Sequence, residues 1–174
     1  MWLYIARIGE GDISVVHVRE AVALLRPALP EHSRLWADLG AGTGTFTLAL
    51  ASIIGREGHI VAVDRDPSAL QVLRRAVDRA GAHIATVETV VADFITLPTL
   101  PPLDGLLIGN ALHYVPTTEQ AVVLRRLGDA LRSGGRMVVV EYEERRPNRW
   151  VPYPISFRRS RLSRDRHGSA HRCE

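Results

Sequence analysis

A glycine-rich turn follows the short apolar run 34–39 and precedes a segment with helical character. A strand that ends in such a turn lets the main chain approach a ligand closely, because no side chain stands between them. Asp38 lies immediately before the glycines, where a carboxylate can bind an ammonium group. The residues that we expect to form this binding loop are Asp38, Leu39, Gly40, Ala41, Gly42 and Gly44.

The glycine spacing distinguishes between two kinds of cofactor. The dinucleotide fingerprint Gly-x-Gly-x-x-Gly needs a glycine at position 45, where this chain has Thr45. A pyrophosphate requires a helix N-terminus that the third glycine brings close, whereas a sulfonium amino acid carries no phosphate and needs a nearby acid for its ammonium group. The spacing therefore favours a sulfonium nucleoside. The alternative is a tight turn with no ligand, in which Asp38 acts as a cap.

Two further acids end apolar runs downstream of the loop. Asp64 follows the run 59–63, about twenty residues beyond the glycines, where a carboxylate can accept both hydroxyls of a ribose. Asp66 precedes Pro67, and we interpret it as a helix cap. Asp93 can accept the adenine amino group while Phe94 packs on the ring, although a turn acid beside a core phenylalanine is an equal reading.

Helical and strand patterns alternate along most of the chain. The expected helices are 15–25, 46–54, 67–80 and 118–131, and the expected strands are 34–39, 59–63, 86–92, 103–108 and 136–140. Strands that alternate with helices at this spacing indicate right-handed crossovers and a parallel sheet. The predicted fold is therefore α/β and doubly wound, with a mostly parallel sheet and helices on both faces.

The ordered motifs of the chain resemble those of class I S-adenosylmethionine-dependent methyltransferases, which are Rossmann-like. The resemblance covers 34–142, and its most specific part is the glycine loop. It implies that Asp38 and the loop hold the methionine part of S-adenosyl-L-methionine, and that Asp64, with its neighbour Arg65, lies at the ribose. The remaining motifs run through 92–94, 104–105, 110–113 and 131–136. They imply that Asp93 binds the adenine and that Asn110 presents its backbone carbonyl to the methionine ammonium.

Methyl transfer from a sulfonium is an in-line displacement with an activated leaving group, so positioning of the acceptor supplies most of the catalysis. A general base is needed only where the nucleophile is protonated. His113 follows the predicted strand 103–108 and is the best-placed titratable residue for that role. The alternative is a loop histidine that packs locally.

The C-terminal part departs from the family pattern. Domains of this family usually continue past the fifth strand with a helix and an antiparallel hairpin, and that hairpin is missing here. We expect a methyltransferase domain in 1–150 and a basic, disordered or aberrant tail in 151–174. Without the hairpin, 136–140 is expected to form an exposed hydrophobic edge, through which two copies could pair as a homodimer.

The basic charge is concentrated at the C-terminus. Residues 1–144 contain 13 Arg and 17 acidic residues, whereas 145–174 contain 9 Arg and 2 acidic residues, and the chain has no Lys. Arginines beside Trp150, Tyr153 and Phe157 resemble a nucleic-acid arm. We interpret the complete absence of Lys as coding bias, so no nucleic acid is expected as a partner.

Composition excludes several classes of protein. Cys173 is the only cysteine, which rules out an internal disulfide and a thiolate metal cluster, and no histidine spacing indicates a metal site. The longest uncharged stretch, 39–55, is broken by glycines and threonines. No secretory signal is recognisable at the N-terminus. We therefore expect a cytoplasmic protein without a membrane span.

Three functions remain to be compared. The first is transfer of a methyl group to a small-molecule acceptor, which the sequence does not identify. The second is a domain that binds S-adenosyl-L-methionine without turnover, because its C-terminus is truncated. The third, an NAD-dependent oxidoreductase, is disfavoured because the chain lacks the Tyr-x-x-x-Lys pair of short-chain dehydrogenases.

Overall fold

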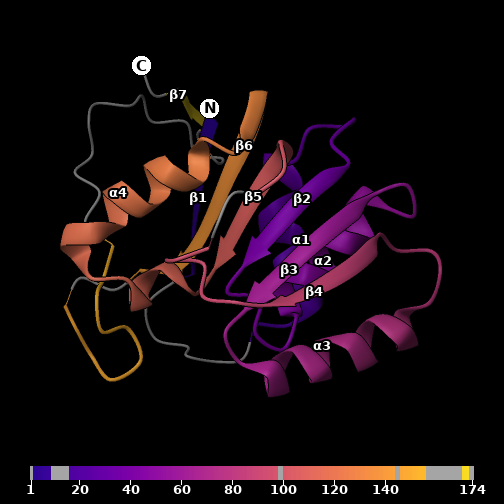
Figure 1. The fold of residues 1–174 in the computed structure, drawn as a ribbon, viewed down its shortest axis with the longest axis horizontal. Helices are drawn as coiled ribbons and strands as arrows, with labels where there is room; N and C mark the ends of the chain where they lie inside the picture. The colour runs from indigo at the N-terminus through magenta and orange to yellow at the C-terminus, as the bar shows by residue number, and fades with distance from the viewer. Residues whose placement is uncertain (1, 9–15, 98–99, 144–145, 156–169, 173–174) are drawn as a thin grey trace.

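The structure, a computed structural model, describes residues 2–8, 16–97, 100–143, 146–155 and 170–172. Within these residues a seven-stranded sheet has the order β4-β3-β2-β5-β6-β1-β7 (Figure 1). The strands are β1 (Trp2–Ile8), β2 (Leu35–Leu39), β3 (His59–Asp64), β4 (Thr86–Val91), β5 (Leu103–Gly109), β6 (Leu131–Tyr142) and β7 (Ala170–Arg172). The helices are α1 (Val18–Leu25), α2 (Thr45–Ile54), α3 (Pro67–Ala80) and α4 (Thr117–Gly128), with short 3-10 turns η1 (Arg26–Ala28) and η2 (Leu112–Tyr114).

The predicted alternation of strands and helices is confirmed, and β1 to β6 run parallel to one another. Helix α3 begins at Pro67, and Asp66 caps it by accepting from Ser68 N at 2.8 Å, as predicted. Two boundaries are wrong. Helix α1 begins at Val18, after the N-cap His17, and so later than predicted. Helix α4 ends at Gly128 and β6 already begins at Leu131, because Leu131 pairs with Leu103 across the sheet ahead of a register shift.

The N-terminus forms a strand that the sequence analysis did not assign. Strand β1 pairs in parallel with β6, from Trp2 opposite Arg136 to Ile8 opposite Tyr142. The expectation of an exposed edge at 136–140 is therefore wrong, and the homodimer that depended on it loses its basis. Successive residues of β1 point to opposite faces of the sheet, and both faces are apolar. Tyr4 is buried on one face, while Ile5 packs against the core on the other, which explains why β1 pairs inside the sheet.

Part of the predicted tail contacts the domain. Val151 is buried, and Tyr153 N donates a hydrogen bond to His113 O at 3.1 Å. Strand β7 pairs antiparallel with β1, so these three residues are extended and not helical or disordered. Residues 156–169 and 173–174, for which disorder was also predicted, lie outside the described part of the chain.

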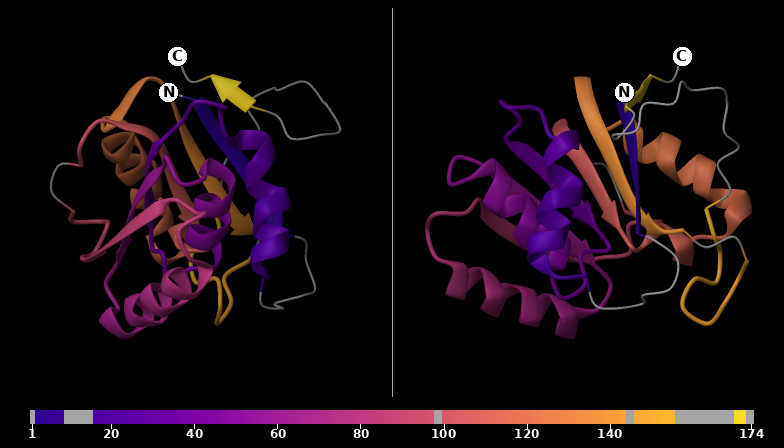
Figure 2. Two further views of the ribbon diagram at one scale, coloured as in Figure 1. Left: turned by 90° about the vertical axis from the view of Figure 1, so that its right-hand side faces the viewer. Right: turned by 180° about the vertical axis from the view of Figure 1, so that it is seen from behind.

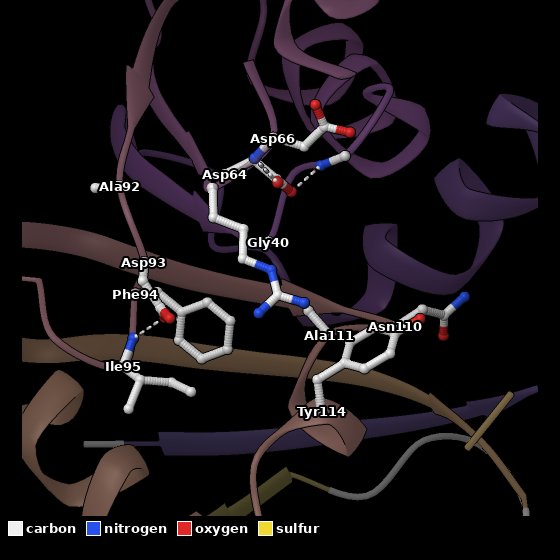
Figure 3. Close-up of a pocket in the computed structure, with 12 residues that line it drawn as sticks. Gly40, Asp64, Asp66, Ala92, Asp93, Phe94, Ile95, Asn110, Ala111 and Tyr114 are labelled. Atoms are coloured by element: carbon white, nitrogen blue, oxygen red, sulfur yellow. Dashed lines mark hydrogen bonds between the residues drawn. The ribbon is translucent and has the colours of Figure 1, made fainter. Parts of the chain in front are cut away.

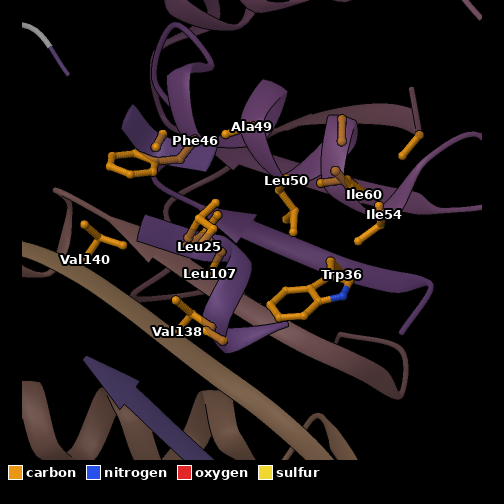
Figure 4. Packing of buried hydrophobic residues seen from close by; sticks show 14 of the residues in the cluster. Leu25, Trp36, Phe46, Ala49, Leu50, Ile54, Ile60, Leu107, Val138 and Val140 are labelled. Carbon is orange, nitrogen blue, oxygen red and sulfur yellow. The ribbon is translucent and has the colours of Figure 1, made fainter. Parts of the chain in front are cut away.

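The sheet is buried on both faces, and the central strands separate two hydrophobic clusters. Val138 of β6 packs toward α1 and α2 with Leu50 and Trp36 (Figure 4), whereas the neighbouring Val139 packs toward α4. In Figure 2 α4 lies on one side of the sheet and α1 on the other. Burial on both faces explains the nearly continuous apolar runs of β5 and β6. Because β2, β3 and β5 are parallel, their carboxyl ends lie at one edge of the sheet, and the site lies there.

Candidate functional site

The glycine loop turns sharply after β2 through left-handed backbone. The φ angles are +80° at Gly40, +53° at Gly42 and +97° at Gly44. Residues other than glycine rarely adopt this left-handed region. The loop is tied to the neighbouring strand because Gly40 N donates to Val63 O at 2.8 Å. The glycines therefore form a fixed backbone surface at the ends of β2 and β3.

Two of these glycines also allow close packing. A Cβ atom at Gly40 would collide with the Cβ of Ala111, and one at Gly44 would collide with Leu73 of α3. A Cβ at Gly42 would meet no atom within 4 Å. Gly40 and Gly44 thus hold the loop against its neighbours, and Gly42 leaves open space beside the backbone.

We expect Gly40→Ala to lower both stability and affinity for the cofactor. The left-handed backbone costs an alanine roughly 1 to 2 kcal/mol, and the collision with Ala111 moves one side of the cavity described below. Thermal unfolding and calorimetry of ligand binding measure the two effects. Gly55→Ala is the matched control, because Gly55 has φ +70° but a Cβ there meets nothing within 4 Å. An unchanged affinity in Gly40→Ala would contradict the assignment.

Asp64, at the end of β3, fixes the loop from the opposite side. Its Oδ2 accepts from Gly42 N at 2.7 Å, and its Oδ1 accepts from Asp66 N at 2.8 Å (Figure 3). Each oxygen keeps a further lone pair, since a carboxylate offers about four acceptor sites. Asp64 is therefore held in one orientation and is still able to accept hydroxyl groups.

A cavity of about 360 Å³ lies at the ends of these strands (Figure 3). Seven of the residues predicted for the cofactor line it: Gly40, Gly42, Asp64, Arg65, Asp93, Phe94 and Asn110. Five further residues in its wall were not predicted to bind the cofactor: Asp66, Ala92, Ile95, Ala111 and Tyr114. The rings of Phe94 and Tyr114, which come from different elements, both face this space. The volume falls within the range of small-molecule sites.

The other predicted residues lie behind the wall. Leu39, Ala41 and Gly44 belong to the loop backbone but do not line the cavity. Asp38 is also buried. Its Oδ2 accepts from Thr47 Oγ1 at 2.6 Å, while its Oδ1 has no hydrogen-bond partner in the described part of the chain.

Burial raises the pKa of Asp38 to about 7. The hydrogen bond from Thr47 opposes this rise, and the nearby negative charge of Asp64 adds to it. An ionised carboxylate with one unpaired oxygen is costly in such surroundings. A bound cation would therefore stabilise the ionised form of Asp38.

Asn110 follows β5 with φ +51°, the one positive φ outside glycine in the described residues. Its backbone N donates to Val140 O at 2.8 Å, and its side-chain Oδ1 is buried without a partner. The sequence analysis assigned the backbone carbonyl of Asn110 to the cofactor. The unpaired Oδ1 adds a second acceptor at the same residue.

His113 is buried behind the wall, and its side chain does not line the cavity. Its Nδ1 lies 2.6 Å from Glu141 Oε2, and its ring centroid lies 4.3 Å from that of Tyr114. The predicted role as a general base stays a prediction. The sequence analysis overlooked Glu141, although an acid at the end of the apolar run 137–140 was a visible signal.

Two negative findings concern only the described residues. None of the helices there is both long and apolar enough to cross a membrane. In the same part of the chain, His, Cys, Asp and Glu side chains do not gather into a group of three or more that could hold a metal ion.

Comparison with known proteins identifies the fold. The model of a family described as "Methyltransferase domain" matches residues 37–135, from β2 to the start of β6. The chain belongs to this methyltransferase family. The match includes the glycine loop, Asp64, Asp93 and Asn110, and the Rossmann-like fold prediction is confirmed.

Relatives of this methyltransferase domain share about a third of its residues. It is 32% identical over 104 residues to carboxy-S-adenosyl-L-methionine synthase of Dichelobacter nodosus, covering 60% of this chain and 43% of that protein. It is 31% identical over 127 residues to 2-phytyl-1,4-naphtoquinone methyltransferase of Thermosynechococcus vestitus, covering 72% and 53%. The chain thus spans about half the length of these relatives.

A solved structure agrees with the fold. Coclaurine N-methyltransferase, bound to N-methylheliamine and SAH, superposes with a TM-score of 0.57 at 18% identity, covering 73% of this chain and 37% of that one. The oxidoreductase alternative finds no support in these matches.

Proposed function

We propose that the protein binds S-adenosyl-L-methionine in the 360 Å³ cavity and transfers its methyl group to a small-molecule acceptor. The observation that carries this proposal is the pair of buried, unpaired acceptor oxygens, Asp38 Oδ1 and Asn110 Oδ1, beside a glycine loop. Buried polar atoms are nearly always hydrogen-bonded, so two orphaned oxygens indicate a missing donor. An ammonium group supplies up to three donors and a positive charge.

The chain fits the rest of this cofactor. Asp64 would accept the ribose hydroxyls, because its two oxygens are already oriented by Gly42 N and Asp66 N. Asp93 is fixed by its bond from Ile95 N at 2.8 Å and would accept the adenine amino group beside the ring of Phe94. Arg65 also lines the cavity and would lie beside Asp64 at the ribose. When bound, S-adenosyl-L-methionine supplies an activated methyl group on its sulfonium.

The acceptor would enter beside Tyr114. This side chain lines the cavity and is 54% exposed, so it lies between the cofactor space and solvent. His113 is adjacent but buried, so it would accept the proton of a hydroxyl or amine nucleophile only after a local opening of this wall exposes its Nε2 atom. The main contribution of the wall is to hold the nucleophile in line with the methyl group and to exclude water.

A small-molecule acceptor is favoured by the relatives. The name of the Thermosynechococcus vestitus protein specifies a naphthoquinone, and a Vibrio cholerae protein 33% identical over 109 residues is a ubiquinone/menaquinone biosynthesis C-methyltransferase.

Isothermal calorimetry with S-adenosylhomocysteine, S-adenosylmethionine and NAD⁺ tests the cofactor. We expect saturable binding of both sulfur nucleosides below millimolar concentration and none of NAD⁺. A folded protein that ignores the two nucleosides would refute the proposal. Formation of S-adenosylhomocysteine across a panel of quinols, phenols and amines then tests transfer. Binding without any product would favour the domain without turnover.

A further inference from the structure

Glu141 is a buried carboxylate at the end of β6 that the proposed chemistry leaves unused. Its Oε1 accepts from Leu112 N at 2.8 Å and from His113 N at 3.2 Å, and its Oε2 contacts His113 Nδ1 at 2.6 Å. We propose that Glu141 is a positioning residue, which holds one wall of the cofactor cavity in place and fixes the proton of His113 on Nδ1. The inference rests on the proposed cofactor site.

The turn that Glu141 holds carries three residues of that wall. Asn110, Ala111 and Tyr114 line the cavity and belong to the segment between β5 and α4. Its beginning is held by β6, because Asn110 N donates to Val140 O. Its middle is held by the next residue of the same strand, Glu141. The wall is thus attached to β6 through one backbone bond and one carboxylate.

No other group in the described residues satisfies the donors that Glu141 satisfies. Leu112 and His113 are both buried, so without the carboxylate their backbone N–H groups would lose their partner away from water. The turn would then have to open or to expose these groups. Either change would move Ala111, which lies close to Gly40 in the cavity wall.

The same contacts define the imidazole tautomer. Oε1 accepts two backbone N–H groups, an arrangement that suits a carboxylate. With Glu141 as a carboxylate, the contact of 2.6 Å between Oε2 and Nδ1 places the proton on Nδ1. In the neutral imidazole, Nε2 is then the unprotonated nitrogen. Glu141 therefore prepares both the cofactor wall and the basic atom of His113.

Three variants separate this role from a general loss of stability. In Glu141→Ala the wall loses its anchor, and we expect affinity for S-adenosylhomocysteine to fall by about tenfold or more. In Glu141→Gln the amide oxygen still accepts both backbone N–H groups, so affinity should stay within about threefold of wild type. Glu143→Gln is the matched control, since Glu143 directly follows β6 and pairs with Arg7 of β1 at the surface. Calorimetry at a temperature where circular dichroism shows folded protein measures each affinity.

Nitrogen-15 NMR of the imidazole ring tests the tautomer without any ligand. Signals of His113 are assigned by their loss in His113→Gln. We expect the Nδ1–H tautomer in the wild type and the Nε2–H tautomer in Glu141→Gln, because the amide NH₂ then donates to Nδ1. This readout remains available if Glu141→Ala fails to fold.

The outcomes are distinct. An Nε2–H tautomer in the wild type overturns the inference. It is also overturned if folded Glu141→Ala has a lower melting temperature but an unchanged affinity, because Glu141 then only stabilises the fold. Failure of the wild type to bind S-adenosylhomocysteine, with the Nδ1–H tautomer observed, refutes the proposed function and leaves the assigned proton intact. Weakened binding in Glu141→Ala, with rescue by Gln, supports the inference.

Discussion

Asp38→Asn is expected to weaken cofactor binding and to flatten the pH dependence of stability. The folded-state pKa of Asp38 is about 7, above the ordinary value of 3.8. The folded protein therefore holds a proton that the unfolded chain has released, and stability falls as pH rises from about 4 to about 7. Above about pH 7 the stability lost through ionisation of Asp38 no longer changes. The shift in its pKa corresponds to roughly 4 kcal/mol in the free energy of unfolding.

Denaturant unfolding between pH 5 and 8 measures this effect. Wild type should lose stability across the lower part of the range, and Asp38→Asn should lose much less, because Asn does not ionise. Asp78→Asn serves as the control, since Asp78 is exposed on α3 and should keep the wild-type slope. Equal slopes in wild type and Asp38→Asn would show that Asp38 is not the titrating group.

The same variant should bind S-adenosylhomocysteine about 10- to 100-fold more weakly, the loss expected for one charge-assisted hydrogen bond. In wild type the affinity should rise with pH as Asp38 ionises, since the ionised carboxylate pairs with the ammonium group. Asp38→Asn should show no such rise between pH 6 and 7.5. An affinity that is independent of pH in both proteins would remove Asp38 from the ammonium site.

Asp64→Ala is expected to abolish most cofactor affinity while leaving the fold intact. It removes the acceptor of the ribose hydroxyls and releases Gly42 N, so we expect a loss of about 100-fold or more. Asp66→Ala provides the contrast. Asp66 caps α3 through Ser68 N, and its loss should cost about 1 kcal/mol of stability with a smaller effect on affinity.

Calorimetry with S-adenosylhomocysteine and thermal unfolding of both variants distinguish the two acids. The two variants should rank in opposite order in the two measurements. Affinity falls most in Asp64→Ala, whereas the unfolding temperature falls most in Asp66→Ala. If Asp66→Ala lost the greater affinity, the ribose would have to be assigned to Asp66, which also lines the cavity.

Local patterns predicted much of this molecule because their causes are local. The glycines of the loop need left-handed backbone, and Pro67 with its aspartate cap begins a helix, whatever surrounds them. Burial on both faces of the sheet produced apolar runs that predicted β2, β3 and β5. Seven predicted cofactor residues meet at one cavity because parallel strands end at the same edge.

The missed features depend on partners distant in sequence. The segment Trp2–Ile8 is apolar, but only β6 determines that it joins the sheet in parallel. Asp38 was recognised as an acid beside the loop, whereas its orphaned oxygen depends on what surrounds it in space. The contact between His113 and Glu141, which lies on another strand, was not predicted either. A rule of spacing along the chain cannot include such contacts.

The position of β1 has a consequence for the order of folding. Its partner β6 is the last of the parallel strands along the chain, so on the ribosome β1 must wait for its partner until the other parallel strands have been synthesised. Such distant pairing gives a high contact order and slows folding. During that interval Tyr4 and its apolar neighbours lack a partner, and chaperone capture of nascent chains should be concentrated there.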